Sequence, residues 1–367
     1  DVSNVLRPKF KLLQNVVAKG AREFAAVNVT KVPGVNASLL VMANYLSPSL
    51  LIPWQGGDSP AVMADSMALH SESMGASAVK TFDVGGWPYI ALAIYANPTT
   101  ANSSLDVHVP SRLLRLGTIL NDTHSNFGLA EAAEHDVGAS KMYGFGVGLA
   151  QELPTSAAHD VELFRAKGNL YLLFAVDLGD TPSQLYVSQG VDAAPVFRLL
   201  QDVNVDGHAT ALHAFYVDDP PSSYGRTVVE TFKAADPVHV VVGRRKGHAI
   251  LLRFNGTQLL APPDASTLPL DWGGGKRIGN DTLETRTQAV LAMSPTGGVA
   301  NTTLLVLGQW DKSQVLHKER AGVCGLQGPS SVLEVNVEGR TFVVVASAQE
   351  HGQNRRVCCS PSCTRQL

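Results

Sequence analysis

The chain has 367 residues, of which 45% are hydrophobic and 17% are charged, and its formal net charge at pH 7 is -3. This near-neutral balance gives no reason to expect nucleic acid or an anionic membrane surface as a partner. No apolar run reaches the roughly 18 residues of a membrane-spanning helix, so no membrane span is expected in this chain.

Short apolar runs separated by Gly, Pro, Asn and Ser predict a succession of β-strands along most of the chain. The runs are about five residues long, which is the usual length of a strand and is too short for a typical helix. In chain order, expected strands lie at residues 39–43, 50–54, 105–109, 114–119, 183–187, 239–242, 250–254, 289–292, 304–307 and 314–316.

Two phrases recur and indicate internal repeats. The phrase Phe-x-Leu-Leu-Gln occurs at residues 10–14 and again at 197–201, and each copy is interpreted as the start of a repeat unit. The second phrase has an aromatic residue or Val, Gly four residues later and an aromatic residue seven later. An aliphatic run that ends in Ala follows it, and the phrase occurs at residues 82–93, 164–175 and 335–346.

The repeats predict an all-β protein, a β-propeller of six or seven four-stranded blades. A pair of β-sandwiches is the rival architecture, but it would not explain the recurring phrases. Gly86, Gly168 and Gly339 are expected in tight hairpin turns, because Gly adopts positive φ without a steric penalty. The expected organisation is an N-terminal arm at 1–9, a propeller at 10–345 and a Cys-rich segment at 346–367.

Asn-X-Ser/Thr sequons indicate a secreted or cell-surface glycoprotein, hence an extracellular location. The alternative is that the sequons are present but unused. The seven candidate glycosylation sites are Asn28, Asn36, Asn102, Asn121, Asn255, Asn280 and Asn301. None lies between residues 122 and 254, so we expect a glycan-free sector that carries the partner surface, with residues 220–236 as a contact loop.

The four cysteines all lie in the last part of the chain, at Cys324, Cys358, Cys359 and Cys363. Four cysteines allow three pairings, and the sequence does not choose among them. We expect Cys324 to form a disulfide with one of the other three and so to close the ring. A small metal site is the less favoured alternative.

One segment has the spacing of a calcium loop. Asp202, Asn204 and Asp206 alternate before Gly207, so their oxygen atoms could converge on one cation. A calcium loop would need further ligands at its ninth and twelfth positions, but Thr210 and His213 occupy these and no carboxylate closes the site. An ordinary turn between strands is therefore favoured. No cofactor is expected, and calcium is kept only as a minor alternative.

The motifs of the common enzyme classes are missing from the sequence. It has no G-x-S-x-G nucleophile elbow, no H-E-x-x-H zinc motif and no phosphate-binding loop with the required spacing. The protein is therefore predicted not to be an enzyme. A carbohydrate-active propeller enzyme is retained as a less favoured alternative.

The recurring phrases together resemble the epitempin repeats, also called EAR repeats. The resembling features are Phe-x-Leu-Leu-Gln, a Gly-Ala about ten residues after its Phe, and the aromatic–Gly–Tyr phrase, spread over about residues 10–360. The resemblance implies a seven-bladed β-propeller in a secreted or cell-surface protein that binds other extracellular proteins and is not an enzyme. No binding residue is carried over, because those of the family do not lie in a fixed motif.

The function expected from these features is a protein–protein or protein–glycan interaction module outside the cell. The main alternative is a structural subunit of an extracellular filament or coat, in which the chain assembles with copies of itself.

Overall fold

The structure is a computed structural model. It describes residues 14, 16, 18–29, 37–54, 61, 66–69, 73–98, 106–118, 145–188, 194–205, 208–216, 238–245, 250–260, 287–293, 304–309, 313–317, 321–324, 329–337 and 340–347. Side chains are described in the part up to residue 260, and the backbone alone is described after it. No helix in this part of the chain is long and apolar enough to cross a membrane.

The described residues form six antiparallel sheets, each built from strands that follow one another in the chain. The first sheet contains β1 (Ala21–Val29), β2 (Ala37–Asn44), β3 (Leu50–Trp54) and β4 (Met67–Ala68). The second contains β5 (Ala76–Val84), β6 (Trp87–Ile94), β7 (Ser111–Thr118) and β8 (Phe145–Leu153). The third contains β9 (Ala158–Ala166), β10 (Asn169–Val176), β11 (Ser183–Ser188) and β12 (Arg198–Val203).

The remaining sheets continue the same pattern. The fourth contains β13 (Ala209–Tyr216), β14 (Val238–Arg244), β15 (Ile250–Phe254) and β16 (Leu259–Leu260). The fifth contains β17 (Thr287–Met293), β18 (Leu304–Gln309), β19 (Ser313–His317) and β20 (Ala321–Cys324). The sixth contains β21 (Pro329–Val337) and β22 (Arg340–Ser347).

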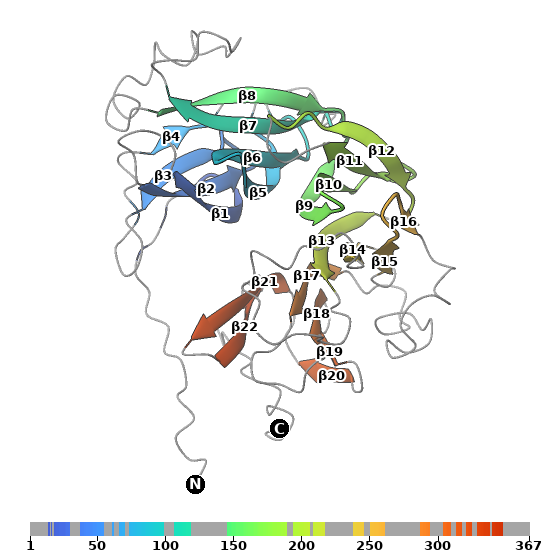
Figure 1. Cartoon of the computed structure of the whole chain (residues 1–367). Helices are drawn as coiled ribbons and strands as arrows, with labels where there is room; N and C mark the ends of the chain where they lie inside the picture. The colour runs from blue at the N-terminus through green and yellow to red at the C-terminus, as the bar shows by residue number, and fades with distance from the viewer. Residues whose placement is uncertain are drawn as a thin grey trace.

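The sheets follow one another around an arc, as the blades of a propeller do (Figure 1). The first strand of each sheet contacts the first strand of the next, from β1 through β5, β9, β13 and β17 to β21. These are the inner strands, and β8, β12, β16 and β20 lie at the outside of the arc. The first and sixth sheets are its two ends (Figure 1). The all-β class and the propeller arrangement are therefore confirmed.

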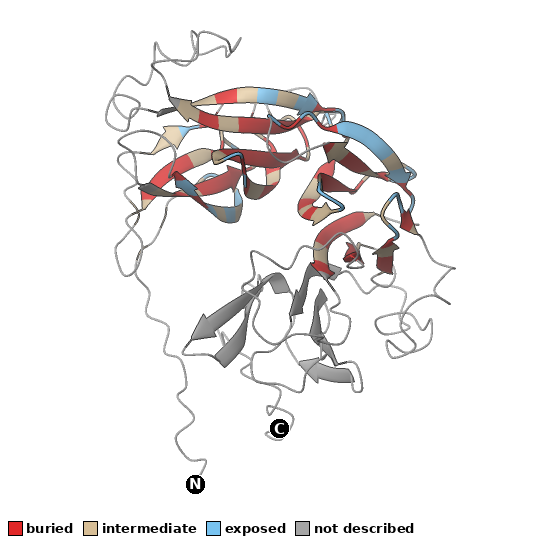
Figure 2. Ribbon diagram, in the orientation of Figure 1, coloured by how far each residue is buried: buried red, intermediate tan, exposed pale blue. Residues whose placement is uncertain are grey.

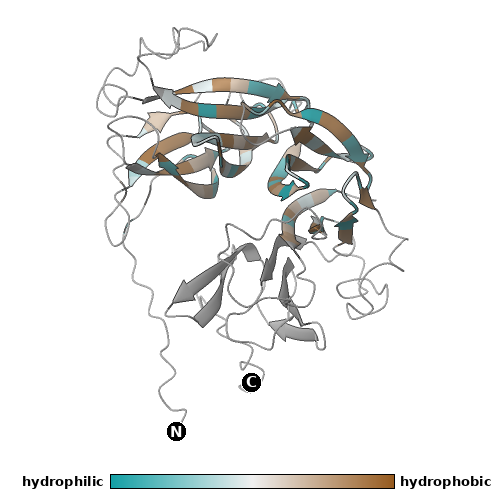
Figure 3. Ribbon diagram, viewed as in Figure 1, coloured by the Kyte–Doolittle hydropathy of each residue, from teal (hydrophilic) through white to brown (hydrophobic). Residues whose placement is uncertain are grey.

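Each middle strand supplies side chains to two hydrophobic cores, one on each face of its sheet. On β10, Leu170 and Leu172 pack towards the second sheet, whereas Tyr171 and Leu173 pack towards the fourth. A strand that is covered on both faces needs an uninterrupted apolar run rather than an alternating pattern. This requirement explains the aliphatic runs of the repeated phrase, and it explains why β6 and β10 are buried almost end to end (Figures 2 and 3).

The second phrase lies on equivalent strand pairs, as predicted. Phe82 pairs with Tyr89 between β5 and β6, Phe164 pairs with Tyr171 between β9 and β10, and Val335 pairs with Phe342 between β21 and β22. In the first two pairs the rings stack, with centroids 5.6 Å and 5.0 Å apart. Cross-strand aromatic pairs of this kind stabilise a hairpin.

The hairpin turns beside these rings have positive φ at both central residues. In one turn these are Gly85 (57°) and Gly86 (82°), and in the other Lys167 (49°) and Gly168 (74°). Positive φ at both positions is the geometry of a type I′ turn, which matches the twist of the two strands. The prediction of a glycine turn is confirmed at Gly86 and Gly168, whereas Gly339 lies outside the described residues.

The same β-bulge occurs near the start of the first strand in all six sheets. The ladder skips one residue between Ala21 and Glu23, and it shifts at the equivalent place in β5, β9, β13, β17 and β21. The skipped residues in the sheets with described side chains are Arg22, Ser77, His159 and Thr210. A bulge re-aims the side chains beside it, and its recurrence shows that the units are structurally equivalent.

The predicted blade count and unit boundaries differ from the structure. The described residues form five four-stranded sheets and one two-stranded sheet, rather than six or seven four-stranded blades, and side chains are described in four of these sheets. The run at 114–119 does not begin a unit of its own, because it falls largely on β7, which pairs with β6 on one side and with β8 on the other, all within the second sheet. Phe197 likewise directly precedes β12, the last strand of the third sheet, and does not start a unit.

The Gln of the first phrase binds both backbone polar groups of a residue far away in the chain. The Gln201 side chain accepts a hydrogen bond from Leu259 N–H (2.8 Å) and donates one to the Leu259 carbonyl (2.9 Å). Gln14 makes the same pair of bonds with Ala61. An amide side chain that binds both polar groups of one residue in this way extends the ladder hydrogen bonding from sheet to sheet. Gln201 thus joins the third sheet to the fourth, whereas Gln14 and Ala61 lie outside the described strands.

The division into an arm at 1–9, a propeller at 10–345 and a terminal segment at 346–367 stays a prediction, because residues 1–13 and 348–367 lie outside the described part.

Candidate functional site

One hydrogen bond recurs at the end of the sheets where the first strands begin. The residue after the second strand donates its N–H to the carbonyl of the residue before the first strand. The four bonds, 2.8–3.0 Å long, join Tyr45 to Gly20, Tyr95 to Gly75, Asp177 to Ala157 and Arg245 to His208. They place Tyr45, Tyr95, Asp177 and Arg245 at equivalent positions in four successive sheets. We call this end of the sheets the entry face.

Partly exposed rings from three sheets contact one another on the entry face. The centroids of Tyr45 and Tyr95 are 6.3 Å apart, and those of Tyr95 and His159 are 6.0 Å apart. The Arg22 guanidinium lies 5.3 Å from the centroid of the Tyr45 ring, within cation–π distance. We call Arg22, Tyr45, Tyr95 and His159 the aromatic row. Burial is the main cause that raises the pKa of Tyr45 above 10.0, so its hydroxyl remains a hydrogen-bond donor at neutral pH.

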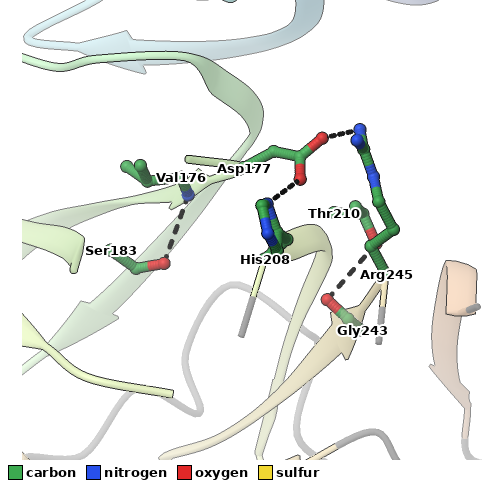
Figure 4. A network of polar contacts seen from close by, with 7 residues as sticks. All are labelled: Val176, Asp177, Ser183, His208, Thr210, Gly243 and Arg245. Carbon is green, nitrogen blue, oxygen red and sulfur yellow. Dashed lines mark hydrogen bonds and ion pairs between the residues drawn. The ribbon is translucent and has the colours of Figure 1, made fainter. Parts of the chain in front are cut away.

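A charged group continues the entry face on the third and fourth sheets (Figure 4). The Asp177 carboxylate is fully buried, with one oxygen 3.0 Å from His208 Nδ1 and the other paired with the Arg245 guanidinium. A buried carboxylate requires such partners, because its desolvation is costly. The side chains of His208 and Arg245 are 27% and 34% exposed, so both reach solvent. We call these three residues the Asp177 cluster.

The hydrogen bonds around the Asp177 cluster hold its strands in place (Figure 4). Val176 N–H donates to Ser183 Oγ (3.2 Å), and Thr210 Oγ1 donates to the Gly243 carbonyl (3.4 Å). His208 occupies the position that Gly20 and Gly75 occupy in the first two sheets. Among the four sheets with described side chains, only the fourth therefore has, at this position, a side chain that can donate and accept hydrogen bonds.

Acidic residues on the inner strands bind the backbone of the next sheet. Val79 N–H donates to Glu23 Oε2 (2.8 Å), and Leu212 N–H donates to Asp160 Oδ2 (2.7 Å). Glu23 and Asp160 both directly follow the bulge of their strands, so the two contacts are equivalent in the repeat. The carboxylates thus satisfy N–H groups on β5 and β13 and tie each sheet to its neighbour.

A lysine and a third carboxylate complete this group. Lys80 Nζ on β5 lies 3.3 Å from Glu162 Oε2 on β9, and the Glu162 side chain is 10% exposed. We call Glu23, Lys80, Asp160 and Glu162 the inner charge cluster. Three carboxylates therefore share one cation among three successive inner strands.

The inner charge cluster raises the pKa values of its carboxyl groups. Burial, and after it the Asp160 charge, raises the pKa of Glu23 to about 7, although Lys80 acts in the opposite direction. Burial, opposed by Lys80, raises the pKa of Asp160 to about 6 and also raises that of Glu162. For Lys80, burial acts to lower the pKa, but the three surrounding carboxylates outweigh it and the pKa lies above its usual range. Glu23 therefore exchanges a proton near neutral pH.

Two of the seven predicted glycosylation sites lie in the described part, and both asparagines are exposed. Asn28 is on β1, where Ser38 Oγ donates to its Oδ1 (2.9 Å). Asn255 begins the turn between β15 and β16, and its Oδ1 accepts from Thr257 N (3.0 Å) and Thr257 Oγ1 (2.9 Å). The others, Asn36, Asn102, Asn121, Asn280 and Asn301, lie outside the described residues.

The predicted calcium and cysteine residues are described only in part. Asp202 is exposed at the end of β12 and Asn204 is exposed just beyond it, but Asp206 lies outside the described residues. Cys324 ends β20, whereas Cys358, Cys359 and Cys363 lie beyond the last described residue. Within the part that the structure describes, no group of three or more His, Cys, Asp or Glu is arranged to hold a metal. Calcium binding and the disulfide remain untested predictions.

The entry face was not predicted from the sequence, although a signal for it is present. In each of the four sheets, the entry-face residue stands two residues after the Ala or Gly that ends an aliphatic run. These residues are Tyr45, Tyr95, Asp177 and Arg245. Aligning the repeats on those runs would have placed the four residues at one equivalent position. The contacts between sheets, by contrast, have no local signature.

No protein-family model and no curated protein matches the chain. Among solved structures, the SapL1 lectin in complex with alpha methyl fucoside is 10% identical, with a TM-score of 0.45, covering 92% of this chain and 91% of the lectin. A GH43 β-xylosidase/α-arabinofuranosidase from a compost microbial metagenome is 11% identical, with a TM-score of 0.35, covering 77% and 89%. A family 43 arabinoxylan arabinofuranohydrolase from Bacillus subtilis is 12% identical, with a TM-score of 0.33, covering 92% and 72%.

These similarities correct one prediction. The prediction that the protein is not an enzyme is contradicted, because glycoside hydrolases occur among the solved structures similar to this chain. The missing motifs belong to other enzyme classes, and their absence does not exclude catalysis by carboxyl groups brought together by the fold. The chain is an all-β protein whose sheets have a propeller arrangement, with an aromatic and charged face at one end of them.

Proposed function

We propose that the protein is a binding module that holds a glycan on its entry face. The observation that carries this proposal is the aromatic row, in which rings from three successive sheets contact one another and remain partly exposed. Aromatic side chains present an apolar face beside a polar edge. A sugar ring has the matching character, since its C–H face is apolar and its rim carries hydroxyl groups.

The charged residues of the entry face supply the polar contacts that such a ligand needs. The guanidinium groups of Arg22 and Arg245 are planar, multiple donors, and the His208 imidazole adds another polar edge. Asp177 holds His208 and Arg245 in place, which lowers the entropy that ligand binding would otherwise cost. A few convergent polar groups around an aromatic surface are typical of small-molecule sites.

A glycan array followed by calorimetry tests this proposal. The purified chain is screened on an array that includes fucosides and xylo-oligosaccharides, and the best ligand is then titrated into Tyr95→Ala and Tyr95→Phe. Tyr95→Ala should weaken binding about tenfold or more, equivalent to about 1.4 kcal/mol, because the ring surface is lost. Tyr95→Phe keeps the ring and should stay close to wild type. Binding that survives Tyr95→Ala, or an array without a single ligand, contradicts the proposal.

The same proposal assigns the protein to the outside of the cell, as a secreted or surface glycoprotein related to the epitempin-repeat propellers. The support is the sequons, two of which expose their asparagine, and the clustered cysteines. Enzymatic removal of N-linked glycans from the native protein should reduce its mass. An unchanged mass contradicts the glycoprotein assignment while leaving the glycan-binding proposal standing.

A second candidate function is acid–base catalysis on the bound glycan. The observation that favours it is the inner charge cluster, where Glu23 has a pKa of about 7 beside Asp160 with a pKa of about 6. A carboxyl group that holds its proton near neutral pH can act as a general acid, while a second carboxylate acts as base or nucleophile.

Aryl glycosides with a chromogenic leaving group test this candidate. If Glu23 is the general acid, then Glu23→Gln should abolish release of the chromophore while leaving glycan binding intact. Turnover that is unaffected by Glu23→Gln, or that is undetectable across an aryl glycoside panel with folded wild-type protein, removes the catalytic function and leaves the binding module.

A further inference from the structure

The inner strand of the first sheet exposes a large apolar side chain at a position that the repeat otherwise buries. Phe24 on β1 is 50% exposed, and its sheet is one end of the described arc (Figure 1). It stands two residues after the bulge, and the residues at that position in the next three sheets are Val79, Val161 and Leu212. These three are no more than 4% exposed, and each packs in the core between its own sheet and the preceding one. The repeat therefore predicts a preceding sheet against Phe24.

The outer part of the same face is already covered. Met42 pairs directly with Phe24 in the ladder between β1 and β2, so both side chains lie on one face of the first sheet. Met42 and Ile52, on β2 and β3, are fully buried, although neither belongs to the core between the first and second sheets. Their burial requires another part of the same chain on this face, while the inner part at Phe24 is open.

The contact of Gln14 indicates which part of the chain belongs there. Gln151 and Gln201 lie on β8 and β12, the fourth strands of their sheets, and each binds the backbone of a residue at the fourth strand of the next sheet. Gln14 makes the same pair of bonds with Ala61, which precedes β4, the fourth strand of the first sheet. Gln14 thus has the position of a fourth strand in a sheet that precedes the first.

Spacing along the chain supports this assignment. Gln14 stands seven residues before β1, and Gln151 stands seven residues before β9. The phrase at 10–14 matches the phrase at 197–201, so residues 11–16 correspond to β12. In the described part, the sixth sheet has two strands where the others have four. The curvature of the arc brings this sheet round towards the first (Figure 1), so it is the sheet that lacks such a strand and precedes β1 in the ring.

We infer that the arc closes into a ring through a contact within one chain. β21 packs along β1 and covers Phe24, and residues 11–16 form the outer strand of the sixth sheet. The segment before β1 therefore fastens the last sheet to the first, and closure leaves no apolar sheet face open at the ends of the arc. The inference rests on the repeat alone and is independent of glycan binding.

Photo-cross-linking in the full chain tests both contacts. Benzoylphenylalanine in place of Phe24 should cross-link to peptides from residues 329–347 of the same chain. In place of Phe10 it should cross-link to residues 287–347, because the equivalent Phe197 packs between its own sheet and the preceding one. In place of Leu199, which is also 50% exposed but lies on β12, it should give no link to 329–347. Sedimentation should show the cross-linked protein to be a monomer.

Thermal unfolding provides a second measurement without a bulky probe. Phe24→Ala should lower the melting temperature by about 4 °C or more, because closure buries the ring and its removal leaves a cavity. Leu199→Ala removes an apolar side chain of the same exposed fraction from a strand outside the contact, and it should lower the melting temperature less than half as much.

Four outcomes overturn the inference. They are an absence of links from position 24 to residues 329–347, links from position 10 that reach only the first sheet, and equal losses of melting temperature in the two alanine variants. The fourth is cross-linking between two chains instead of within one, because a second copy would then occupy the face.

Discussion

At the residue scale, the repeat depends on a few positions where the backbone conformation favours glycine. Gly75 has φ of 82°, and a Cβ added to it would lie 1.7 Å from the carbonyl oxygen of Ala96. Gly168 has φ of 74°, but a Cβ added there would meet no atom within 4 Å. Both residues adopt the left-handed conformation that costs any other residue about 1–2 kcal/mol. They differ only in the space around them.

This pair of glycines gives a matched prediction. Gly168→Ala should lower the free energy of unfolding by about 1 kcal/mol, from the positive φ alone. Gly75→Ala should cost about 3 kcal/mol or more, because the backbone that carries the recurring hydrogen bond must also move. Chemical denaturation of the two variants measures the difference. Equal losses would show that the contact with Ala96 is relieved without cost.

Glu23 provides a prediction on pH. Its pKa in the folded protein is about 7, above the ordinary value of 4.5, so the folded state binds the proton more tightly than the unfolded chain does. Its contribution to stability is fully present below about pH 4.5 and is lost as the pH rises through about 7. The loss amounts to about 3 kcal/mol for this shift at about 1.4 kcal/mol per pH unit.

Denaturation of wild type and Glu23→Gln between pH 4.5 and 8 measures this effect. Glutamine has no proton to lose, yet its side-chain carbonyl can still accept the Val79 N–H bond. The variant should therefore lack the share of this fall that Glu23 contributes, whereas the shares of Asp160 and Glu162, whose pKa values are also raised, should remain. Two parallel stability curves would contradict the role given to Glu23.

At the element scale, each sheet is joined to the next by side chains that bind backbone groups. Glu23 and Asp160 do this on the inner strands, whereas Gln201 and Gln151 do it on the outer strands. These bonds pair backbone groups of one sheet with side chains of its neighbour, in addition to the apolar contacts between the sheets. The Gln of the Phe-x-Leu-Leu-Gln phrase makes such a contact at Gln201, and Gln151 makes the same contact without the phrase.

Gln201→Ala tests the sheet-joining role. The change leaves the N–H and carbonyl of Leu259 without their partner, and the expected loss of unfolding free energy is about 1–3 kcal/mol. Gln184→Ala, on neighbouring β11, is a control for the loss of a glutamine side chain in the same sheet. If both variants lose the same free energy of unfolding, the bonds to Leu259 contribute no more than the loss of any glutamine side chain in this sheet.

At the scale of the whole molecule, the sheets form an arc with the entry face at one end of the strands and β12 at its outside. The entry face is built from residues of four successive sheets, so ligand binding there depends on how the sheets are arranged and not on any one of them.

The ends of the arc lead to a prediction on the cysteines. Cys324 ends β20, the outer strand of the fifth sheet, and the other three follow β22 in the chain. A disulfide between Cys324 and one of them would tie the fifth sheet to the chain beyond the sixth and stabilise the fold by roughly 2–4 kcal/mol. Peptide mapping without reductant should find this link. Four free thiols would refute it.

The sequence by itself determined the properties that depend on neighbouring residues. The all-β class, the hairpins with Gly86 and Gly168, and the aromatic pairs beside them follow from short apolar runs and turn residues, because turn geometry and strand alternation are local. Only the tertiary structure decided which runs share a sheet, since β7 joins β6 and β8 joins β7 across long connections that have no local signal. The same holds for the functional surfaces. Glu23, Lys80 and Asp160 share one cluster because successive inner strands are adjacent in space, and such non-local contacts are set by how the sheets pack rather than by any single segment.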